Sequence, residues 1–520
     1  TARDMSGLLL LSMCVTVVFN QRSAQGQFLG RQPHIIYILA DDLGFNDVPW
    51  TNPEIEAKKL KYIAEEGIIL ENNYNLHVCT PSRTSLMTGL YPFRTGRQYR
   101  RIRPLEPTGV PLRFPFLSEK LRDLGYHTHI VGKWHLGYCA EEYLPQNRGF
   151  DSFFGMLLGS MHYKEHTSSH GFKEARKDEL KSLRLKSRGW ALWNGTAPFY
   201  PVPENIHSTE LYATEVVRVI KGHPVEKPLF LYLPLQQPHS PVIIEDNYID
   251  KYRGRKLSRK RMEYLGLVET IERTLRKLLT SLKERDMYDN SIIIFNSDNG
   301  GSLQWGGSNF PLRGGKGSLY DGGTRFPAVV FSPILQKLGI RSQVKKGLFH
   351  MSDWFKTIIR VAGGNPPPGP DGYDMWDYIT QDIPSPRDEV VINISDALKF
   401  SGSIRYRQWK LIVHCLKEKY LDGDVPDPCY ECLEGSSIPD NCPELNGRPS
   451  LSVELYNMDE DVSEHSNLAP QHVDLVKQMV RRLEFYWDQS QSVDILLDDP
   501  KGLPTDAKDP YAPGWCTAQQ

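Results

Sequence analysis

The amino-acid sequence predicts an α/β protein with a large, mostly parallel mixed sheet flanked by helices and a smaller C-terminal α+β domain. Apolar runs of strand length alternate with helix-like patterns over the first two thirds of the chain. Each run ends in ionisable or amide side chains, as expected where a parallel sheet carries its site at the carboxyl ends of its strands. The turn-rich tract Gly363 to Gly372 then precedes a region of shorter strand-like pieces.

The elements of the large domain follow from apolar periodicity. His34 to Ala40 is a continuous, β-branched apolar run, typical of a strand buried on both faces. Pro53 to Glu66 places its apolar residues on one face of a helix. The other expected strands are Thr128 to Val131, Pro228 to Leu235 and Ser291 to Asn296, and the other helices are Leu117 to Leu124, Lys260 to Lys283 and Ser352 to Ala362.

We expect the large domain over residues 33–375 and the small α+β domain over residues 385–520. The strands of the small domain are expected at Val390 to Ile394, Gly402 to His414 and Ser452 to Tyr456, and its helix at Gln471 to Trp487. Four cysteines cluster between residues 415 and 442, which indicates a cross-linked segment.

The composition supports a large core and excludes some classes of protein. Of 520 residues, 40% are hydrophobic and 24% are charged, which excludes intrinsic disorder as the main character. Lys plus Arg is 62 and Asp plus Glu is 63, a net charge of −1, so no global positive field indicates a nucleic acid partner. Local sites must therefore select the partners.

Residues 1–25 are interpreted as a secretory signal peptide, with a buried N-terminal helix as the alternative. Their apolar run, Gly7 to Phe19, is shorter than the roughly 20 residues of a bilayer span, so we expect no stable membrane insertion. Glycosylation acceptor sequences at Asn194 and Asn393 and the eight cysteines fit the same oxidising compartment. The sequence therefore predicts a protein of the secretory pathway, lysosomal or secreted.

Two polar pairs follow strand-like runs and suggest a metal site. Asp41 and Asp42 follow the first run, and Asp298 and Asn299 follow the fourth. Carboxylate and amide oxygens suit Ca²⁺ or Mg²⁺, whereas Zn²⁺ would prefer His or Cys. The alternative for either pair alone is a turn, since these residues are common turn formers.

Two longer motifs favour a specific family. The segment CTPSRTSLMTG at residues 79–89 and the segment GYHTHIVGKWH at residues 125–135 resemble, in order, the two signatures of the type I, formylglycine-dependent sulfatases. The resemblance extends from about residue 33 to about residue 490. Pro81 and Ser82 suit the first turn of a helix, which would place Cys79 near a helix N-terminus, where anions are favoured.

The resemblance implies an alkaline phosphatase-like sulfatase fold and a nucleophile derived from Cys79, which a formylglycine-generating enzyme would oxidise to an aldehyde. In the hydrated aldehyde, one oxygen attacks sulfur and the other then expels sulfate and regenerates the aldehyde. A thiol would instead form a thiosulfate-type ester that has no second oxygen to expel sulfate. The alternative for Cys79 is a buried or disulfide-bonded cysteine.

The family's site residues carry over to matching positions. One Ca²⁺ is expected to be held by Asp41, Asp42, Cys79 as formylglycine, Asp298 and Asn299. Arg83 and His135 would hydrogen-bond the hydrated aldehyde, and His135 would help to remove a proton. Lys133 and Lys316 would bind the sulfate oxygens. His239 would protonate or polarise the leaving alcohol oxygen, a task suited to a group that titrates near the lysosomal pH range.

Within the family, the segments at residues 145–163, 311–314 and 318–323 most resemble the arylsulfatase B subgroup. This implies removal of sulfate from a sulfated carbohydrate, N-acetylgalactosamine 4-sulfate of dermatan or chondroitin sulfate. The alternatives are an arylsulfatase with another sulfated substrate, a phosphatase of the same superfamily and a non-catalytic binder of sulfated polymers.

The chain departs from the subgroup at two places. Gly315 stands where the subgroup has an arginine before the lysine, which puts recognition of the sugar in question. Cysteines near residues 105 and 145 are missing, whereas Cys139 and Cys516 are present and are suggested to pair with each other.

Several polar residues lie outside these motifs or without a role in them. The basic stretches Lys173 to Arg188 and Lys251 to Arg261 are interpreted as solvated faces, with attraction of a polyanionic glycosaminoglycan as the alternative. His127, His129 and His162 are interpreted as ordinary histidines.

Overall fold

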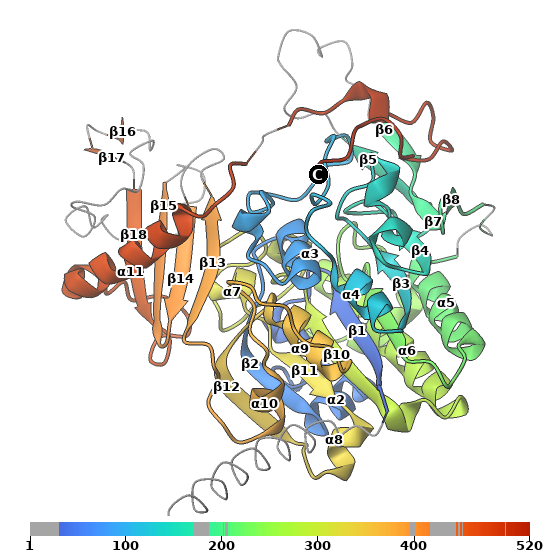
Figure 1. The fold of residues 1–520 in the computed structure, drawn as a ribbon, viewed down its shortest axis with the longest axis horizontal. Coiled ribbons are helices and arrows are strands. Elements are labelled where there is room, and N and C mark those ends of the chain that lie inside the picture. The colour runs from blue at the N-terminus through green and yellow to red at the C-terminus, as the bar shows by residue number, and fades with distance from the viewer. Residues whose placement is uncertain are drawn as a thin grey trace, which may run out of the picture.

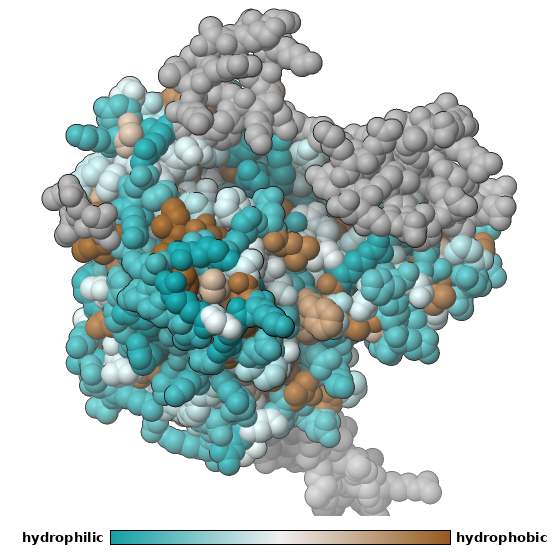
Figure 2. All heavy atoms as spheres, turned by 180° about the vertical axis from the view of Figure 1, so that it is seen from behind, coloured by the Kyte–Doolittle hydropathy of each residue, from teal (hydrophilic) through white to brown (hydrophobic). Residues whose placement is uncertain are grey.

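The computed structural model describes residues 31–170, 187–200, 202, 206–395, 401–415, 444–445, 448–449, 451–493 and 496–520. The expected signal peptide, nearly all of the basic stretch Lys173 to Arg188, and Cys429, Cys432 and Cys442 lie outside these residues. No helix in the described part is long and apolar enough to cross a membrane. On the face drawn in Figure 2, hydrophobic side chains form small separate groups among hydrophilic ones.

A mixed sheet with helices on both faces forms the centre of the molecule (Figure 1). β1 (His34–Ala40) lies between β10 (Ser291–Ser297) and β9 (Leu229–Pro234) and is parallel to both. β3 (His127–Lys133) and β4 (Ser152–Met156) continue the parallel part. The edges are formed by β11 (Ala328–Phe331), β2 (Ile68–Tyr74) and β12 (Gln343–His350) beyond β10, and by β7 (Leu192–Asn194) and β8 (Ala197–Pro198) beyond β4.

The central strands have the composition of parallel strands covered on both faces. All seven residues of β1 and all seven of β10 are buried. β2 was not predicted, because Glu71, Asn72 and Asn73 interrupt its apolar pattern. The structure compensates these polar groups, since Nδ2 of Asn73 donates to Oδ1 of Asn296 at 3.1 Å.

The helices of the large part pack in two layers. α5 packs on α6 and β3, and α6 packs on α2, whereas α3, α4 and α9 contact one another and lie against β3 and β12. These helices are α2 (Lys58–Glu65), α3 (Cys79–Thr88), α4 (Leu117–Asp123), α5 (Ser208–Gly222), α6 (Arg259–Glu284) and α9 (Asp353–Val361). Shorter helices are α7 (Asp321–Thr324), α8 (Pro333–Lys337) and α10 (Trp376–Thr380). The predicted α/β class is thereby confirmed.

The helix expected over Pro53 to Glu66 begins only at Lys58. The preceding residues form a turn, in which Oδ1 of Asn52 accepts from the Glu54 amide at 3.0 Å and the Asn52 carbonyl accepts from the Ile55 amide at 3.1 Å. The side-chain oxygen of Asn52 thus competes with helical hydrogen bonding at this end.

A separate antiparallel sheet follows, with one helix lying across it (Figure 1). Its strands are β13 (Glu389–Ser395), β14 (Ser401–Tyr406), β15 (Trp409–Cys415) and β18 (Leu451–Asn457), and its helix is α11 (Val473–Trp487). Gly402 to His414 is therefore a hairpin of two strands, which turns at Arg407, whose φ is 52°. Two small ribbons complete the strands, β5 (Thr167–His170) with β6 (Ser187–Trp190) and β16 (Glu444–Leu445) with β17 (Arg448–Pro449).

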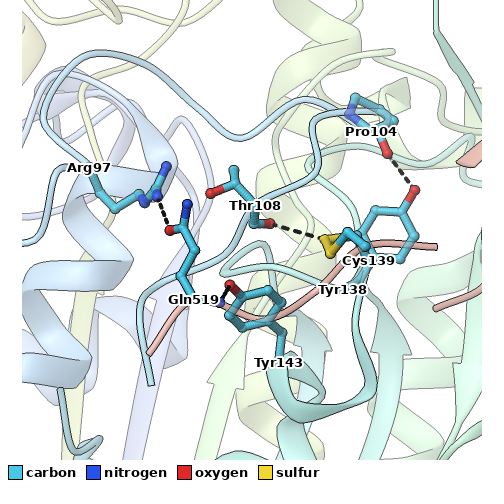
Figure 3. The surroundings of a disulfide bond; sticks show 8 residues. Arg97, Pro104, Thr108, Tyr138, Cys139, Tyr143 and Gln519 are labelled. Carbon is cyan, nitrogen blue, oxygen red and sulfur yellow. Dashed lines mark hydrogen bonds between the residues drawn. A yellow bond between two sulfur atoms is a disulfide. The ribbon is translucent and has the colours of Figure 1, made fainter. Parts of the chain in front are cut away.

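The end of the chain returns to the large part (Figure 3). The disulfide Cys139–Cys516, which the sequence suggested, joins positions 377 residues apart. Beside it, the Gln519 amide donates to the Tyr143 hydroxyl at 2.6 Å, and Arg97 donates to the side chain of Gln519 at 2.9 Å. These last residues therefore pack against the large part, although they were expected to belong with the small domain. The domain boundaries themselves stay a prediction.

A buried ion pair connects the second sheet to the large part and should be costly to break. Nζ of Lys410 in β15 lies 2.7 Å from Oδ1 of Asp321 and 2.7 Å from Oε1 of Glu464, with all three side chains fully buried. Lys410→Met leaves these carboxylates without that cation, so the free energy of unfolding should fall by about 3–5 kcal/mol. Thermal and urea unfolding measure the change. Lys337→Met, at an exposed ion pair with Asp289, should change stability by less than about 1 kcal/mol, and an equal effect in both variants would contradict the expectation.

Candidate active site

Two acidic residues leave the central sheet side by side. Ala40, the last residue of β1, is in register with Ser297, the last residue of β10, and the Asp298 amide donates to the Ala40 carbonyl at 3.0 Å. Because these strands are parallel, Asp41 and Asp298 emerge at the same edge of the sheet. Both side chains are fully buried.

Asp42 and Asn299 complete this cluster. Asp42 has a φ of 65°, a conformation that costs free energy for a residue other than glycine and occurs preferentially at functional sites. Its amide donates to Oδ1 of Asp298 at 3.3 Å, and its Oδ1 accepts from Nδ2 of Asn299 at 2.8 Å. The four predicted metal ligands from the two strand ends therefore lie together.

Cys79 faces the cluster from the first residue of α3. Its Sγ lies 3.8 Å from Oδ1 of Asp41, and its side chain is completely buried. Burial raises the pKa of the thiol above its ordinary value. Cys79 forms no disulfide in the structure, so its alternative as a disulfide partner is wrong. α3 ends at Thr88 and is capped by Gly89, whose φ of 70° suits a residue without a side chain.

Arg83 lies one helical turn beyond Cys79 and is held by three hydrogen bonds. Its Nε and Nη2 donate to Oδ2 of Asp298 at 3.1 and 2.9 Å, and Nη1 donates to the Lys133 carbonyl at 3.0 Å. The guanidinium is fully buried. Arg83 thus couples the helix of the first motif to the strand end of the second.

Two lysines bring further positive charge. Nζ of Lys133, the last residue of β3, lies 2.6 Å from Oδ2 of Asp41. Nζ of Lys316 lies 2.7 Å from Oδ1 of Asp42 and 2.9 Å from its Oδ2. The Lys316 side chain is 16% exposed, whereas that of Lys133 is fully buried, so Lys316 lies nearer to solvent.

The cluster fits a hard divalent cation. Oδ1 of Asn299 is buried without a hydrogen-bond partner in the described chain. This oxygen is therefore available as a metal ligand. Ligand atoms of Asp41, Asp42, Cys79 and His239 all lie within 4.8 Å of one another. Burial and the neighbouring Asp298 raise the pKa of Asp41 to about 7, so its ionised form needs more positive charge.

His135 occupies a constrained position beside the cluster. Its φ is 59°, and its Nε2 lies 2.9 Å from the Ile102 carbonyl. A carbonyl only accepts hydrogen bonds, so Nε2 carries the proton and Nδ1 carries the lone pair. Nδ1 is buried without a partner among the described residues. Burial and Lys133 lower the pKa of His135 well below its ordinary value, so the ring is neutral and can accept a proton at Nδ1.

His239 lies on the loop after β9. Its Nδ1 lies 2.6 Å from the Ser240 carbonyl, so Nδ1 donates and Nε2 is left as the acceptor, 3.7 Å from Oδ2 of Asp42. Burial and Lys316 lower the pKa of His239 well below its ordinary value. The expectation that this ring titrates near the lysosomal range therefore does not match the structure, because burial and the positive charge of Lys316 oppose a second positive charge on the ring.

Three residues that had no expected role support the site. The Thr80 hydroxyl donates to the His135 carbonyl at 3.3 Å and accepts from the Ile102 amide at 3.1 Å. The Ser82 hydroxyl donates to the Asp298 carbonyl. Thr80 and Ser82 lie in the first motif, and this position in the sequence could have identified them as residues of the site. Gln237 is buried, and its side-chain amide has no partner in the described part of the chain; nothing in its sequence context indicated this.

The loop that carries Lys316 explains the glycine at position 315. A Cβ added to Gly315 would lie 2.8 Å from the Gly301 carbonyl oxygen and 3.0 Å from Nδ2 of Asn309. Any side chain there would require the loop to shift. The same loop presents Leu303 to solvent at 58% exposed, and Cγ of Leu303 would lie 3.2 Å from the added Cβ, so apolar surface borders the residue before Lys316.

The basic stretch Lys251 to Arg261 is largely neutralised by acidic partners. The ion pairs are Lys251 with Glu269, Arg253 with Asp250, Arg255 with Glu56, Arg259 with Glu263 and Arg261 with Asp47. Little unbalanced charge is left to attract a polyanion, so the structure favours a solvated, ion-paired face.

The two glycosylation acceptors differ in exposure. Asn194 is exposed at the end of β7. Asn393 lies inside β13 with 5% of its surface exposed, and Ser395 of the same acceptor sequence is 3% exposed. This burial disagrees with the surface position that the acceptor sequence at Asn393 predicts, because a glycan needs an exposed side chain.

Comparisons with known proteins agree on one family. The sulfatase family matches residues 33–364. Arylsulfatase J of Mus musculus is 34% identical over 504 residues, covering 93% of this chain and 81% of that protein. N-acetylgalactosamine-6-sulfatase of Homo sapiens is 30% identical over 64% of this chain and 63% of its own length. The crystal structure of Ps i-CgsB in complex with k-i-k-neocarrahexaose has a TM-score of 0.72 at 26% identity, covering 91% of this chain and 96% of that one.

Proposed function

The chain belongs to the sulfatase family, and from that premise we propose that it removes sulfate from N-acetylgalactosamine 4-sulfate at the end of a glycosaminoglycan chain. It is an enzyme that hydrolyses sulfate esters, with the fold of that family. The observation that carries the proposed chemistry is the position of Cys79, buried at the start of α3 and 3.8 Å from a carboxylate of the metal cluster.

The charges around Cys79 suit an anionic substrate. Three buried carboxylates face three basic side chains, so these six groups balance; they are Asp41, Asp42 and Asp298 against Arg83, Lys133 and Lys316. A bound divalent cation would leave this set with two positive charges. Such a site attracts the negative charge of a sulfate ester and stabilises it where water is excluded.

Two prosthetic features complete the proposed site. Ca²⁺, held by Asp41, Asp42, Asp298, Asn299 and residue 79, would polarise the sulfate and supply positive charge. Formylglycine at position 79 would supply a nucleophilic oxygen that a thiol cannot replace. The residues present fit both, since Asn299 keeps an unpartnered buried oxygen and Cys79 is unpaired.

The remaining residues bind the substrate and handle protons. Lys133 and Lys316 hold sulfate oxygens, and Arg83 holds Asp298 in place through two hydrogen bonds. His135 accepts a proton at Nδ1. His239 is neutral in the resting site, and an anionic sulfate beside Nε2 would raise its pKa, which would allow it to protonate the leaving alcohol oxygen.

The sugar is proposed from three lines of support. The sequence segments resemble the arylsulfatase B subgroup. A relative, N-acetylgalactosamine-6-sulfatase, is named for the same sugar with its sulfate at another position, and a structural neighbour was solved with an oligosaccharide. Leu303, which lies next to Gly315, offers exposed apolar surface on which a sugar ring can pack near Lys316.

Hydrolysis of oligosaccharides that end in the 4-sulfated or the 6-sulfated sugar tests this choice. We expect kcat/KM to be roughly 100-fold higher for the 4-sulfate, because a site built for one oxygen position leaves polar groups unpaired with the other. A preference for the 6-sulfate would overturn the proposed sugar and leave the sulfatase activity unaffected.

Maturation and location are part of the proposal. A formylglycine-generating enzyme would act on Cys79 in the secretory pathway. The protein would then be delivered to lysosomes or secreted. The disulfide Cys139–Cys516 and the exposed acceptor Asn194 support such an oxidising route.

Mass spectrometry of protein secreted from a eukaryotic host tests the nucleophile. The tryptic peptide from Tyr62 to Arg83 should carry an aldehyde in place of the Cys79 thiol, and the same sample should turn over an aryl sulfate. An unmodified thiol, in a cell that modifies a control sulfatase, would remove the proposed nucleophile.

Removal of divalent cations should abolish turnover, and Ca²⁺ should restore it. Without a cation, three buried carboxylates repel one another, so the midpoint of thermal unfolding should also fall. Chelation followed by titration with Ca²⁺ or Mg²⁺ measures both effects, and Ca²⁺ should act at the lower concentration. Full turnover in protein shown to be free of metal would contradict the calcium site.

A further inference from the structure

Four histidines gather at the edge of the central sheet opposite the candidate active site. His34 and His127 are the first residues of β1 and β3, and His129 follows two residues later in β3. His223 caps the C-terminal end of α5. Because β1 and β3 are seven residues long, this cluster lies about 20 Å from the metal cluster at the other strand ends.

Three of these rings have the arrangement of a metal site. One nitrogen from each of His127, His129 and His223 lies within 4.8 Å of the other two. The His223 ring stands edge-on to that of His127 at a centroid distance of 5.6 Å and to that of His129 at 6.3 Å. Tetrahedral zinc sites hold such nitrogens about 3.4 Å apart, given zinc–nitrogen bonds of about 2.0–2.1 Å. Small side-chain rotations would close the gap.

His223 presents a lone pair that no group in the described chain uses. Its Nε2 lies 2.9 Å from the Lys227 carbonyl, which only accepts, so Nε2 carries the proton. Nδ1 is therefore the basic nitrogen, and it is buried without a partner. The residue is 2% exposed. A ring whose second nitrogen donates to a backbone carbonyl is the usual form of a histidine that binds a metal ion.

His129 has a similar supporting contact. Its Nδ1 lies 2.6 Å from the Ser152 hydroxyl, which can accept a hydrogen bond from it; in that tautomer Nε2 carries the lone pair for a ligand.

His34 borders the three rings but takes another role. Its Nδ1 accepts from the Leu229 amide at 3.2 Å, so its Nε2 carries the proton and cannot bind a cation. Its ring packs edge-on against His223 at 5.8 Å. The ligand set is therefore His127, His129 and His223.

We propose that His127, His129 and His223 bind a Zn²⁺ ion through three imidazole nitrogens, with water in the fourth position. Neutral nitrogen ligands favour zinc over Ca²⁺, which takes oxygen ligands, so this site and the carboxylate cluster would select different ions. Charged neighbours of both signs surround the rings, with Asp151 and Arg218 near His129. Affinity must therefore come from the imidazoles themselves. The site would tie the start of β3 to the end of α5, independently of sulfate hydrolysis.

The site can be tested by calorimetry. The full chain is first saturated with Ca²⁺ and then titrated with Zn²⁺. We expect one Zn²⁺ per chain. His127→Gln and His129→Gln should each lower the zinc affinity by more than about 100-fold, a larger loss than removal of a residue that only supports a ligand causes. His465→Gln removes an exposed histidine that follows β18 and should bind zinc as the parent does. Unchanged affinity in both test variants, or no zinc binding by the parent, would overturn the proposal.

Two further measurements locate the ion. Co²⁺ in place of Zn²⁺ should give the visible absorption of a tetrahedral site in the parent and lose it in His127→Gln, while sulfate ester turnover stays within about twofold and shows that the variant is folded. Anomalous diffraction at the zinc edge should place the ion between β3 and α5. Zinc found only beside Asp41 and Asp42 would contradict the assignment.

Discussion

Cys79→Ala should lower the rate of sulfate ester hydrolysis by on the order of 10⁵–10⁶-fold, the loss seen when a covalent nucleophile is removed from a hydrolase. Cys79 is the first residue of α3 and lies against Asp41, so its derived oxygen would be the one group able to attack the bound sulfate. Alanine leaves Lys133 and Lys316 to bind the sulfate. We therefore expect kcat to fall and substrate binding to persist.

The fold of this variant should be retained, because alanine suits a helix and removes one buried sulfur atom. Thermal unfolding and competitive binding of inorganic sulfate measure these properties. Met87→Leu, a volume-conserving change at a fully buried position of the same helix, should keep the parent's activity. Turnover by Cys79→Ala at more than about one hundredth of the parent's rate would show that another group attacks the sulfur.

Asp298→Asn should lower both activity and metal affinity by more than about 100-fold, beyond the loss caused by a supporting residue of a metal site. Asp298 binds two nitrogens of Arg83 and the Asp42 amide, and it follows directly after β10. The amide keeps the shape of the side chain and removes its charge. Arg83 would then be a buried cation without its main partner, so the free energy of unfolding should fall by about 3–5 kcal/mol.

Activity as a function of Ca²⁺ concentration separates the two effects. Excess Ca²⁺ should restore part of the activity if affinity is the main loss, and none if Arg83 is displaced. Asp289→Asn, at an exposed side chain paired with Lys337, is the matched control and should leave activity, calcium response and stability unchanged. If Asp298→Asn behaves like this control, Asp298 is not a ligand.

The sequence predicted the strands that carry the site, because a strand buried on both faces must be an unbroken apolar run. β1 and β10 are such runs, and the polar residues after them lie together as expected. Some strands with polar residues escaped prediction. β2 is one of these, since the side chain of Asn73 finds partners on other segments, the Asn296 side chain and the Phe326 carbonyl.

The electrostatics of the site were not accessible from the sequence. His239 was expected to titrate near the lysosomal range, whereas burial and Lys316 lower its pKa. The stretch Lys251 to Arg261 was ambiguous until its ion pairs were known, which include Glu56 and Asp47 from distant parts of the chain. Asn393 satisfies an acceptor sequence that the fold buries.

The sequence by itself determined the chemistry of the candidate site, because a motif fixes which side chains share a helix or a strand end. Cys79 and Arg83 occupy successive turns of α3 for that reason. Only the tertiary structure decided what depends on distant segments, such as the meeting of His127 and His129 with His223. Such contacts are made by packing α5 against β3, and no local pattern records which residues that packing brings together.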